Sequence, residues 1–229
     1  MKCILILKVV LVVNNINLNI DKNVLNLFSS NSISKILNEL NLDKCYELKQ
    51  VHSNIVHIVD NNYINKSVGD AIITNIPNIP LVIKVADCIP IIIYDKQNKV
   101  LALIHSGWKG TLSNITSNTI QEMENNFNSK KEFLSVYIYP SIRKCHFEVE
   151  FDVYSLFKNK IKNIDKYTTK KGIKYYIDLQ SIIKDNLREL GITNIIDTNI
   201  CTYCNCDKYY SYRYNHTDKR NILLAMIKE

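Results

Sequence analysis

Four short apolar runs define the predicted core of the chain. Each run is rich in β-branched residues, and turn-forming or charged residues separate one run from the next. This pattern indicates buried β-strands. The runs cover residues 81–83, 91–94, 100–104 and 134–139.

Two chemically interesting residues follow directly from these strands. Cys88 is predicted at one strand end, beside Pro90, which we expect to interrupt strand pairing. His105 is predicted at another strand end, just before Gly107. Strand ends and their loops often line pockets, so both positions are candidates for a functional site.

Helical periodicity replaces the strand pattern after Gly110. Apolar residues recur on one face as far as Phe127, and Thr111 or Ser113 is available as an N-cap. We therefore predict a long helix in this segment.

Two further helices are predicted in the last third of the chain. One runs from the N-cap Asp178 to Gly191, a residue suited to the position after a helix end. The other covers residues 217–228 and closes the chain.

Strands and helices mix without the regular alternation of a doubly wound sheet, and no internal repeat or glycine-rich nucleotide loop is present. We therefore expect an α+β fold in a single domain over residues 1–229. Its core is a mixed, sandwich-like β-sheet flanked by helices. The apolar residues 1–13 are predicted to be a buried first strand, because the stretch is short for a membrane span and no small-residue cleavage site follows.

Composition excludes several classes of protein. The 229 residues are 46% hydrophobic and 22% charged, which is typical of a globular domain. The net charge of +7 is spread along the chain without a basic run, so nucleic acid and membrane are not expected partners, and an anionic small substrate fits equally well. Seven cysteines, an odd number, argue against a disulfide framework and for the cytoplasm.

His52, Cys88 and His105 form a candidate three-ligand zinc site. Two imidazoles and a thiolate suit zinc, and a catalytic zinc keeps its fourth position for water or substrate. The sequence spacing of the three residues carries no local geometric signature. Taken singly, Cys88 also fits a buried core thiol and His52 a surface imidazole.

Five motifs occur in the order seen in the laccase-domain family, which the chain therefore resembles from about residue 35 to its end. This family is also labelled multicopper polyphenol oxidase, peptidoglycan editing factor and zinc-dependent purine nucleoside phosphorylase. The motifs are Gln50-Val51-His52, Gly69-Asp70-Ala71-Ile72-Ile73-Thr74, Val85-Ala86-Asp87-Cys88-Ile89-Pro90, His105-Ser106-Gly107-Trp108-Lys109-Gly110 and Ser211-Tyr212-Arg213.

The resemblance implies Zn²⁺ held by His52, Cys88 and His105. It also implies phosphorolysis of purine nucleosides (adenosine, inosine and methylthioadenosine) with phosphate as the second substrate, together with adenosine deamination. Arg213 matches a family motif and is a candidate for binding phosphate, with Lys109 as a weaker one.

Asp87 is a candidate general base, although adjacent residues of a strand point to opposite faces. Asp87 and Cys88 can both face the metal only if the chain kinks between them. Alternatively, the Asp87 carboxylate supports the metal ligands or stabilises the turn. The family's N-terminal arginine segment has no counterpart before Asn31, which bears on substrate preference.

Other functions remain open from sequence alone. A metal-free Cys-His hydrolase would use Cys88 as nucleophile and His105 or His52 as base, as in an amidase that edits peptidoglycan precursors. A non-catalytic binding protein is a further alternative. A copper phenol oxidase is disfavoured, because a blue copper and a trinuclear cluster need far more imidazoles than the five histidines present.

A second group of cysteines lies near the C-terminus. Cys201, Cys204 and Cys206 have metal-ligand spacing, but no further His or Cys nearby in sequence completes a set of four. A role without a metal is therefore the favoured interpretation, and metal binding by these cysteines stays open.

Overall fold

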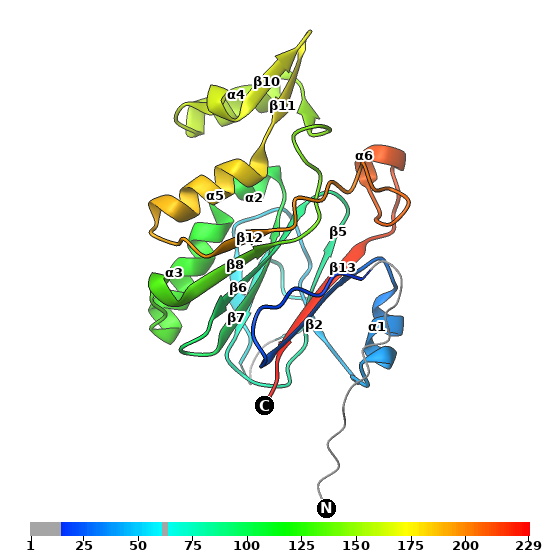
Figure 1. Cartoon of the computed structure of the whole chain (residues 1–229), viewed down its shortest axis with the longest axis vertical. Coiled ribbons are helices and arrows are strands. Elements are labelled where there is room, and N and C mark those ends of the chain that lie inside the picture. Colours follow the sequence, from blue (N-terminus) through cyan, green and yellow to red (C-terminus); the bar gives the residue numbers. More distant parts are fainter. Residues whose placement is uncertain (1–14, 61–63) are drawn as a thin grey trace, which may run out of the picture.

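The structure is a computed structural model that describes residues 15–60 and 64–229, so the strand expected in residues 1–13 lies outside the described residues. Its largest sheet is mixed: the central strand pairs are antiparallel, and the two outer pairs are parallel. In spatial order it contains β12 (Ile195–Asp197), β8 (Leu134–Ile138), β6 (Ile89–Asp95), β7 (Val100–Ser106), β4 (Ala71–Thr74) and β3 (Val56–Ile58) (Figure 1).

A four-stranded sheet packs against one face of the six-stranded sheet. Leu101 and Leu103 of the larger sheet share a buried cluster with Phe28, Ile83 and Leu223 of the smaller one. This contact makes the core a β-sandwich, as predicted. The smaller sheet contains, in order, β1 (Val24–Ser29), β13 (Asn221–Ile227), β5 (Leu81–Val85) and β2 (Tyr46–Glu47).

Helices cover the outer faces of the two sheets (Figure 1). On the six-stranded sheet, Ile91 and Ile93 point to the helical side, whereas Ile92 and Tyr94 point to the other sheet. This alternation is the period of two expected of a strand. The helices on that side are α2 (Trp108–Leu112), α3 (Ile115–Phe127) and α5 (Leu179–Glu189), and α1 (Ile33–Glu39) covers the four-stranded sheet.

A small sheet extends from one end of the sandwich, beside α4 (Phe151–Lys160) (Figure 1). It contains β10 (Thr168–Lys171), β11 (Lys174–Ile177) and β9 (Glu148–Val149). The remaining elements are α6 (Tyr212–Asn215) and two 3₁₀ turns, η1 (Lys131–Phe133) and η2 (Ile164–Lys166). No helix in residues 15–60 or 64–229 has the length and apolar character needed to cross a membrane.

The strands predicted at 81–83, 91–94 and 100–104 are confirmed as parts of β5, β6 and β7, and the one predicted at 134–139 is β8, which ends one residue earlier, at Ile138. The helix that begins after Asp178 is confirmed as well. The Asp178 side chain accepts a hydrogen bond from the backbone N–H of Ser181, and Gly191 has a φ of +88° just past the helix end.

The helix predicted after Gly110 is in fact two helices. The first begins at Trp108, before the expected start, and the second begins at Ile115. Between them Asn114 adopts a left-handed backbone with φ of +57°, which a helix cannot continue. The caps proposed at Thr111 and Ser113 are therefore wrong.

The prediction for residues 217–228 is also wrong, because the segment contains the strand β13 and not a helix. All seven residues of this strand are buried, and it pairs with β1 on one side and β5 on the other. A central strand with two covered faces has a continuous apolar sequence without alternation, so periodicity does not separate it from a helix.

The prediction that Pro90 interrupts strand pairing is wrong. It lies within β6 opposite His105 of β7, and its carbonyl accepts a hydrogen bond from the backbone N–H of Tyr139. The proline lies near the start of the strand, where a missing donor is tolerated.

Candidate metal centre and adjoining cavity

The structure brings His52, Cys88 and His105 together. His52 lies in the loop between β2 and β3, Cys88 lies between β5 and β6, and His105 is in the last part of β7. One donor atom from each residue lies within 4.8 Å of the others, and the Cys88 Sγ is 3.7 Å from His52 Nε2. The three residues are therefore close enough to share one metal ion.

Asp70, which sequence reasoning did not single out as a site residue, holds two of these residues in place. Its carboxylate accepts a hydrogen bond of 2.7 Å from His105 Nδ1 and others from the backbone N–H groups of Val51, His52 and Ser53. Burial would raise the pKa of Asp70, but the hydrogen bonds from His105 and Ser53 outweigh burial and hold this pKa well below its usual range.

The hydrogen bond to Asp70 decides which nitrogen of His105 is available. Because the ionised carboxylate can only accept, Nδ1 carries the proton. The other ring nitrogen, Nε2, is then the one that can act as a metal ligand, once it has given up its own proton. The sequence offers one signal for this role, an aspartate directly before the apolar residues 71–73, because a carboxylate next to a buried strand needs hydrogen-bond partners.

Gly107 leaves the space that the side chains of His52 and Cys88 occupy. A Cβ atom at this position would lie 2.6 Å from His52 Cδ2 and 3.2 Å from Cys88 Sγ. The φ of Gly107 is −73°, which any residue can adopt, so space and not backbone freedom requires the glycine.

Hydrogen bonding makes Cys88 an acidic thiol. Burial alone would raise its pKa, but hydrogen bonds and charge interactions with His105 and His52 lower it to about 6. Burial likewise acts to lower the pKa of His105, and the hydrogen bonds to Asp70 and Cys88 raise it to about 9. Cys88 is therefore a thiolate near neutral pH, which is the form that binds a metal. The donor set of one thiolate and two imidazoles fits a borderline ion such as zinc.

The three residues lie in the wall of a cavity of about 560 Å³. This volume is in the range of pockets for small molecules. Its wall combines apolar and aromatic side chains with the cations Lys84, Arg213 and Arg220. The apolar members include Leu48, Trp108, Ile142, Phe147, Leu179 and Tyr212.

Asp87 and Arg213 are joined to each other in this wall. Asp87 has a φ of +85°, so the chain does turn sharply beside Cys88. Its carboxylate accepts hydrogen bonds from the Thr202 hydroxyl (2.6 Å) and from the backbone N–H of Arg213 (2.7 Å). This geometry supports the turn-stabilising interpretation of Asp87, and a role as general base stays a prediction.

The Arg213 side chain is positioned by main-chain carbonyls. Its Nη1 donates to the carbonyl oxygens of His146 (2.9 Å) and Glu148 (3.0 Å). Its Nε and Nη2 make no hydrogen bond to the part of the chain that the structure describes, and the residue lines the cavity. Lys109 is exposed and does not line the cavity, and Arg220, which sequence reasoning missed, does.

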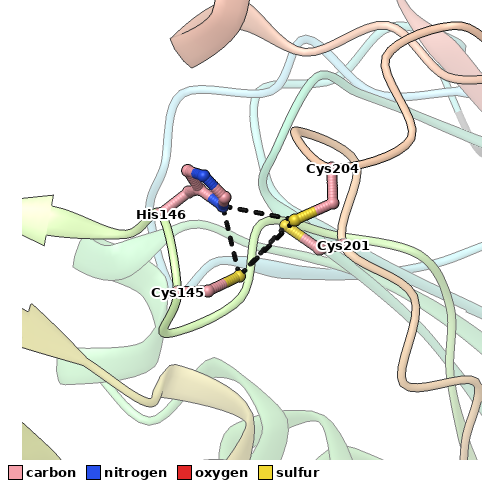
Figure 2. A group of neighbouring side chains, drawn as sticks. All are labelled: Cys145, His146, Cys201 and Cys204. Atoms are coloured by element: carbon pink, nitrogen blue, oxygen red, sulfur yellow. Dashed lines mark hydrogen bonds between the residues drawn. The ribbon is translucent and has the colours of Figure 1, made fainter.

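A second His/Cys cluster includes two of the C-terminal cysteines, with donors that are distant in sequence. Cys145 and His146, which precede β9, lie beside Cys201 and Cys204, and the four donor atoms are within 4.8 Å of one another (Figure 2). The two halves of this set are far apart in sequence and are brought together by the fold. The segment after β8 lies beside the segment after its parallel neighbour β12, and an isolated bridge between Ser141 and Cys201 joins the two segments. Cys206 is not part of the cluster.

Comparison with known proteins places the chain among relatives of similar length. It is 32% identical over 219 residues to a purine nucleoside phosphorylase of Clostridium acetobutylicum, with 94% of this chain and 89% of that protein covered. It is 31% identical over 193 residues to a purine nucleoside phosphorylase of Campylobacter jejuni, with 82% and 79% covered.

Solved structures share the fold. A Neisseria meningitidis protein described as DUF152 matches with a TM-score of 0.85 at 20% identity, over 94% of this chain and 100% of that one. The YfiH protein of Bacillus licheniformis matches with a TM-score of 0.79 at 22% identity, over 85% and 79%. Residues 18–228 match the family described as multi-copper polyphenol oxidoreductase laccase, and the chain belongs to that family.

Proposed function

We propose that the protein is a zinc-dependent purine nucleoside phosphorylase whose active site is the cavity beside His52, Cys88 and His105. One observation carries the proposal: a three-donor metal site and two arginines, Arg213 and Arg220, line one cavity of a size suited to a nucleoside. Relatives that carry the name purine nucleoside phosphorylase cover most of the chain.

Phosphorolysis exchanges one bond at the sugar for another. A phosphate oxygen forms a bond to the anomeric carbon, the bond from that carbon to the purine nitrogen breaks with its electron pair, and the purine leaves with a proton from solvent or a neighbouring group. In our proposal, Arg213 and Arg220 hold the phosphate dianion by charge-assisted hydrogen bonds. Holding the anion against the sugar lowers the entropic barrier.

The remaining wall serves the nucleoside. Phe147 and Tyr212 offer aromatic surface for the purine ring, and Leu48 and Leu179 help to exclude water from the reacting bond. His52, Cys88 and His105 would hold the zinc, which when bound supplies Lewis acidity in the cavity. Adenosine deamination, in which water replaces the amino group and ammonia leaves, is a second activity we propose for the same cavity.

The copper chemistry in the family's description does not suit this chain. A blue copper site and a trinuclear cluster together need far more histidines than five. In the described residues, His57 bonds to the Val68 carbonyl and the ring of His216 packs on Tyr212, so neither joins the trio.

A Cys-His hydrolase is the second candidate function. The lowered pKa of Cys88 and its contact with His52 would also suit a nucleophilic thiolate in an amidase. The two functions differ in their response to chelators. An amidase that uses Cys88 as nucleophile keeps its activity when metal is removed, and a zinc-dependent phosphorylase loses it.

All six cysteines in the described residues are free thiols, which is in keeping with the cytoplasmic location we propose.

Incubation with nucleosides tests the reaction class. Adenosine, inosine and methylthioadenosine are each incubated with the protein, with and without phosphate, and the products are separated by chromatography. The proposal expects free purine and a sugar 1-phosphate only when phosphate is present. Release of purine at the same rate without phosphate would indicate a hydrolase and would contradict it.

A further inference from the structure

We propose that Cys145, His146, Cys201 and Cys204 form a second metal site, which binds zinc in a structural role. The site is separate from the cavity trio and shares no residue with it. Figure 2 shows the three sulfur atoms and the imidazole turned toward one common point. Three thiols and one imidazole make up a complete donor set for a four-coordinate structural zinc.

Four of the six distances between donor atoms are close to those around a tetrahedral zinc ion. The Cys145 Sγ is 3.7 Å from the Cys201 Sγ and 3.8 Å from the Cys204 Sγ. Two sulfurs bound to one tetrahedral zinc, each at about 2.3 Å, lie about 3.8 Å apart. His146 Nδ1 is 3.2 Å from the Cys145 Sγ and 3.3 Å from the Cys204 Sγ, within a few tenths of an ångström of the corresponding separation.

Two turns of the fold bring these residues together. Residues 140–147 follow β8, and residues 198–206 follow β12, its parallel neighbour. The backbone N–H of Thr202 donates to the Ser141 carbonyl, which ties the two turns side by side. The His146 ring stacks on Tyr203, with centroids 3.9 Å apart, and this contact fixes the ring with Nδ1 toward the thiols.

The chemistry of the donors favours zinc over a disulfide. A disulfide bond is about 2.05 Å long and joins two sulfurs, so it would leave the third cysteine and His146 without a use. The set contains no carboxylate, and thiolate with imidazole is the combination that zinc accepts. Four protein ligands leave no open position, so the role is structural.

The site would stabilise one wall of the cavity. The carbonyl oxygen of His146 accepts a hydrogen bond from Arg213, and the hydroxyl of Thr202 donates to Asp87. His146 and Thr202 belong to the two turns that the metal would join. A zinc ion here would thus fix the segments that position Arg213 without touching the substrate.

Metal content of matched variants tests the site directly. The proteins are purified under reducing, oxygen-free conditions and analysed by elemental mass spectrometry, with Cys88→Ala used to remove a ligand of the cavity trio. We expect one zinc per chain in Cys88→Ala, and none in Cys88→Ala combined with Cys204→Ser. Cys206→Ser is the matched control, because Cys206 is an exposed neighbour outside the cluster; combined with Cys88→Ala it should keep one zinc.

Cobalt substitution gives a second readout that does not depend on catalysis. In the Cys88→Ala protein, cobalt should produce the strong visible and thiolate charge-transfer absorption of a tetrahedral thiolate site, and Cys145→Ser should weaken that charge-transfer band. Cys145 and Cys204 are exposed, so their replacement by serine is not expected to prevent folding. Absence of zinc from the folded Cys88→Ala protein, iron or copper in its place, or a disulfide between two of the three cysteines would overturn the proposal.

Discussion

His105 Nδ1 donates a hydrogen bond of 2.7 Å to the fully buried carboxylate of Asp70. The same carboxylate accepts the backbone N–H of His52, so one acidic group orients two of the three proposed metal ligands. Partners of this kind fix the tautomer of a ligand histidine and keep its ring in position.

Asp70→Asn should therefore weaken metal binding without removing a ligand. The asparagine side chain keeps the shape of the aspartate but lacks its charge and one of its acceptor oxygens. We expect zinc affinity, measured by competition with a chelator, to fall roughly 10–100-fold. Asp207→Asn, at an exposed position, is the control and should leave the affinity unchanged. Equal affinities in the two variants would show that Asp70 does not position the ligands.

Gly107→Ala should damage the trio while leaving the fold intact. The new methyl group would lie 2.6 Å from a His52 ring carbon, so the His52 side chain has to move. We expect loss of zinc from the trio and loss of nucleoside cleavage, with an unchanged circular dichroism spectrum. In the control Gly110→Ala the nearest atom is 3.4 Å from the new Cβ, which is ordinary contact, and its zinc content should match the wild type. A fully active Gly107→Ala protein would refute the steric argument.

Arg213→Gln should raise the KM for phosphate selectively. Hydrogen bonds to a charged group contribute about 1.5–3 kcal/mol, which corresponds to an increase of roughly 10–100-fold. The KM for the nucleoside should change much less, because Arg213 is assigned to the anion. Steady-state kinetics with each substrate varied in turn separate the two effects. Arg188→Gln, an exposed arginine on α5, is the control. A rise confined to the nucleoside KM would contradict the assignment.

Protonation of Asp197 at acid pH should lower the free energy of unfolding of the protein. Burial would raise the pKa of Asp197, but the hydrogen bonds and charge of Arg143, the backbone N–H of Asn199 and a hydrogen bond from Lys184 lower it from 3.8 to about 2. A lowered pKa means that this contribution to the free energy of unfolding is fully present above about pH 4. It is lost as the pH falls through about 2, and it amounts to roughly 2 kcal/mol.

Urea denaturation at about pH 5 and about pH 2 measures this contribution. Asp197→Asn lacks the titrating group, so its free energy of unfolding should depend less on pH over this range than that of the wild type. Asp218→Asn, at an exposed position, should behave like the wild type. If all three proteins lose stability equally, the Arg143–Asp197 pair does not account for the acid sensitivity.

The sequence was a good guide where one physical signal dominates. Runs of β-branched residues such as 91–94 are buried strands because both faces of the six-stranded sheet are covered. The strand β13 of the four-stranded sheet is also buried on both faces, and its continuous apolar sequence fits a helix as well as a strand, so it was not predicted. The break at Asn114 depends on a single left-handed residue, which hydrophobic spacing does not reveal.

The two His/Cys clusters show where sequence reasoning stops. The chemistry of His52, Cys88 and His105 and their places in family motifs suggest a shared site, and only the fold shows that their donor atoms lie together. Cys145 and His146 are more than fifty positions from Cys201, and the parallel pairing of β8 with β12 makes them neighbours. Asp70 lay within a recognised motif, but its role follows from hydrogen bonds that no spacing predicts.

Phosphate-dependent cleavage of inosine by the wild type and by Cys88→Ala tests the central claim most directly. Both proteins are loaded with zinc, freed of excess metal and assayed for hypoxanthine and ribose 1-phosphate. We predict equal amounts of the two products from the wild type, none without phosphate, and none from Cys88→Ala at any phosphate concentration. Full activity in a Cys88→Ala protein that retains zinc at the trio, or a wild type that cleaves no nucleoside when loaded with metal, would contradict the account.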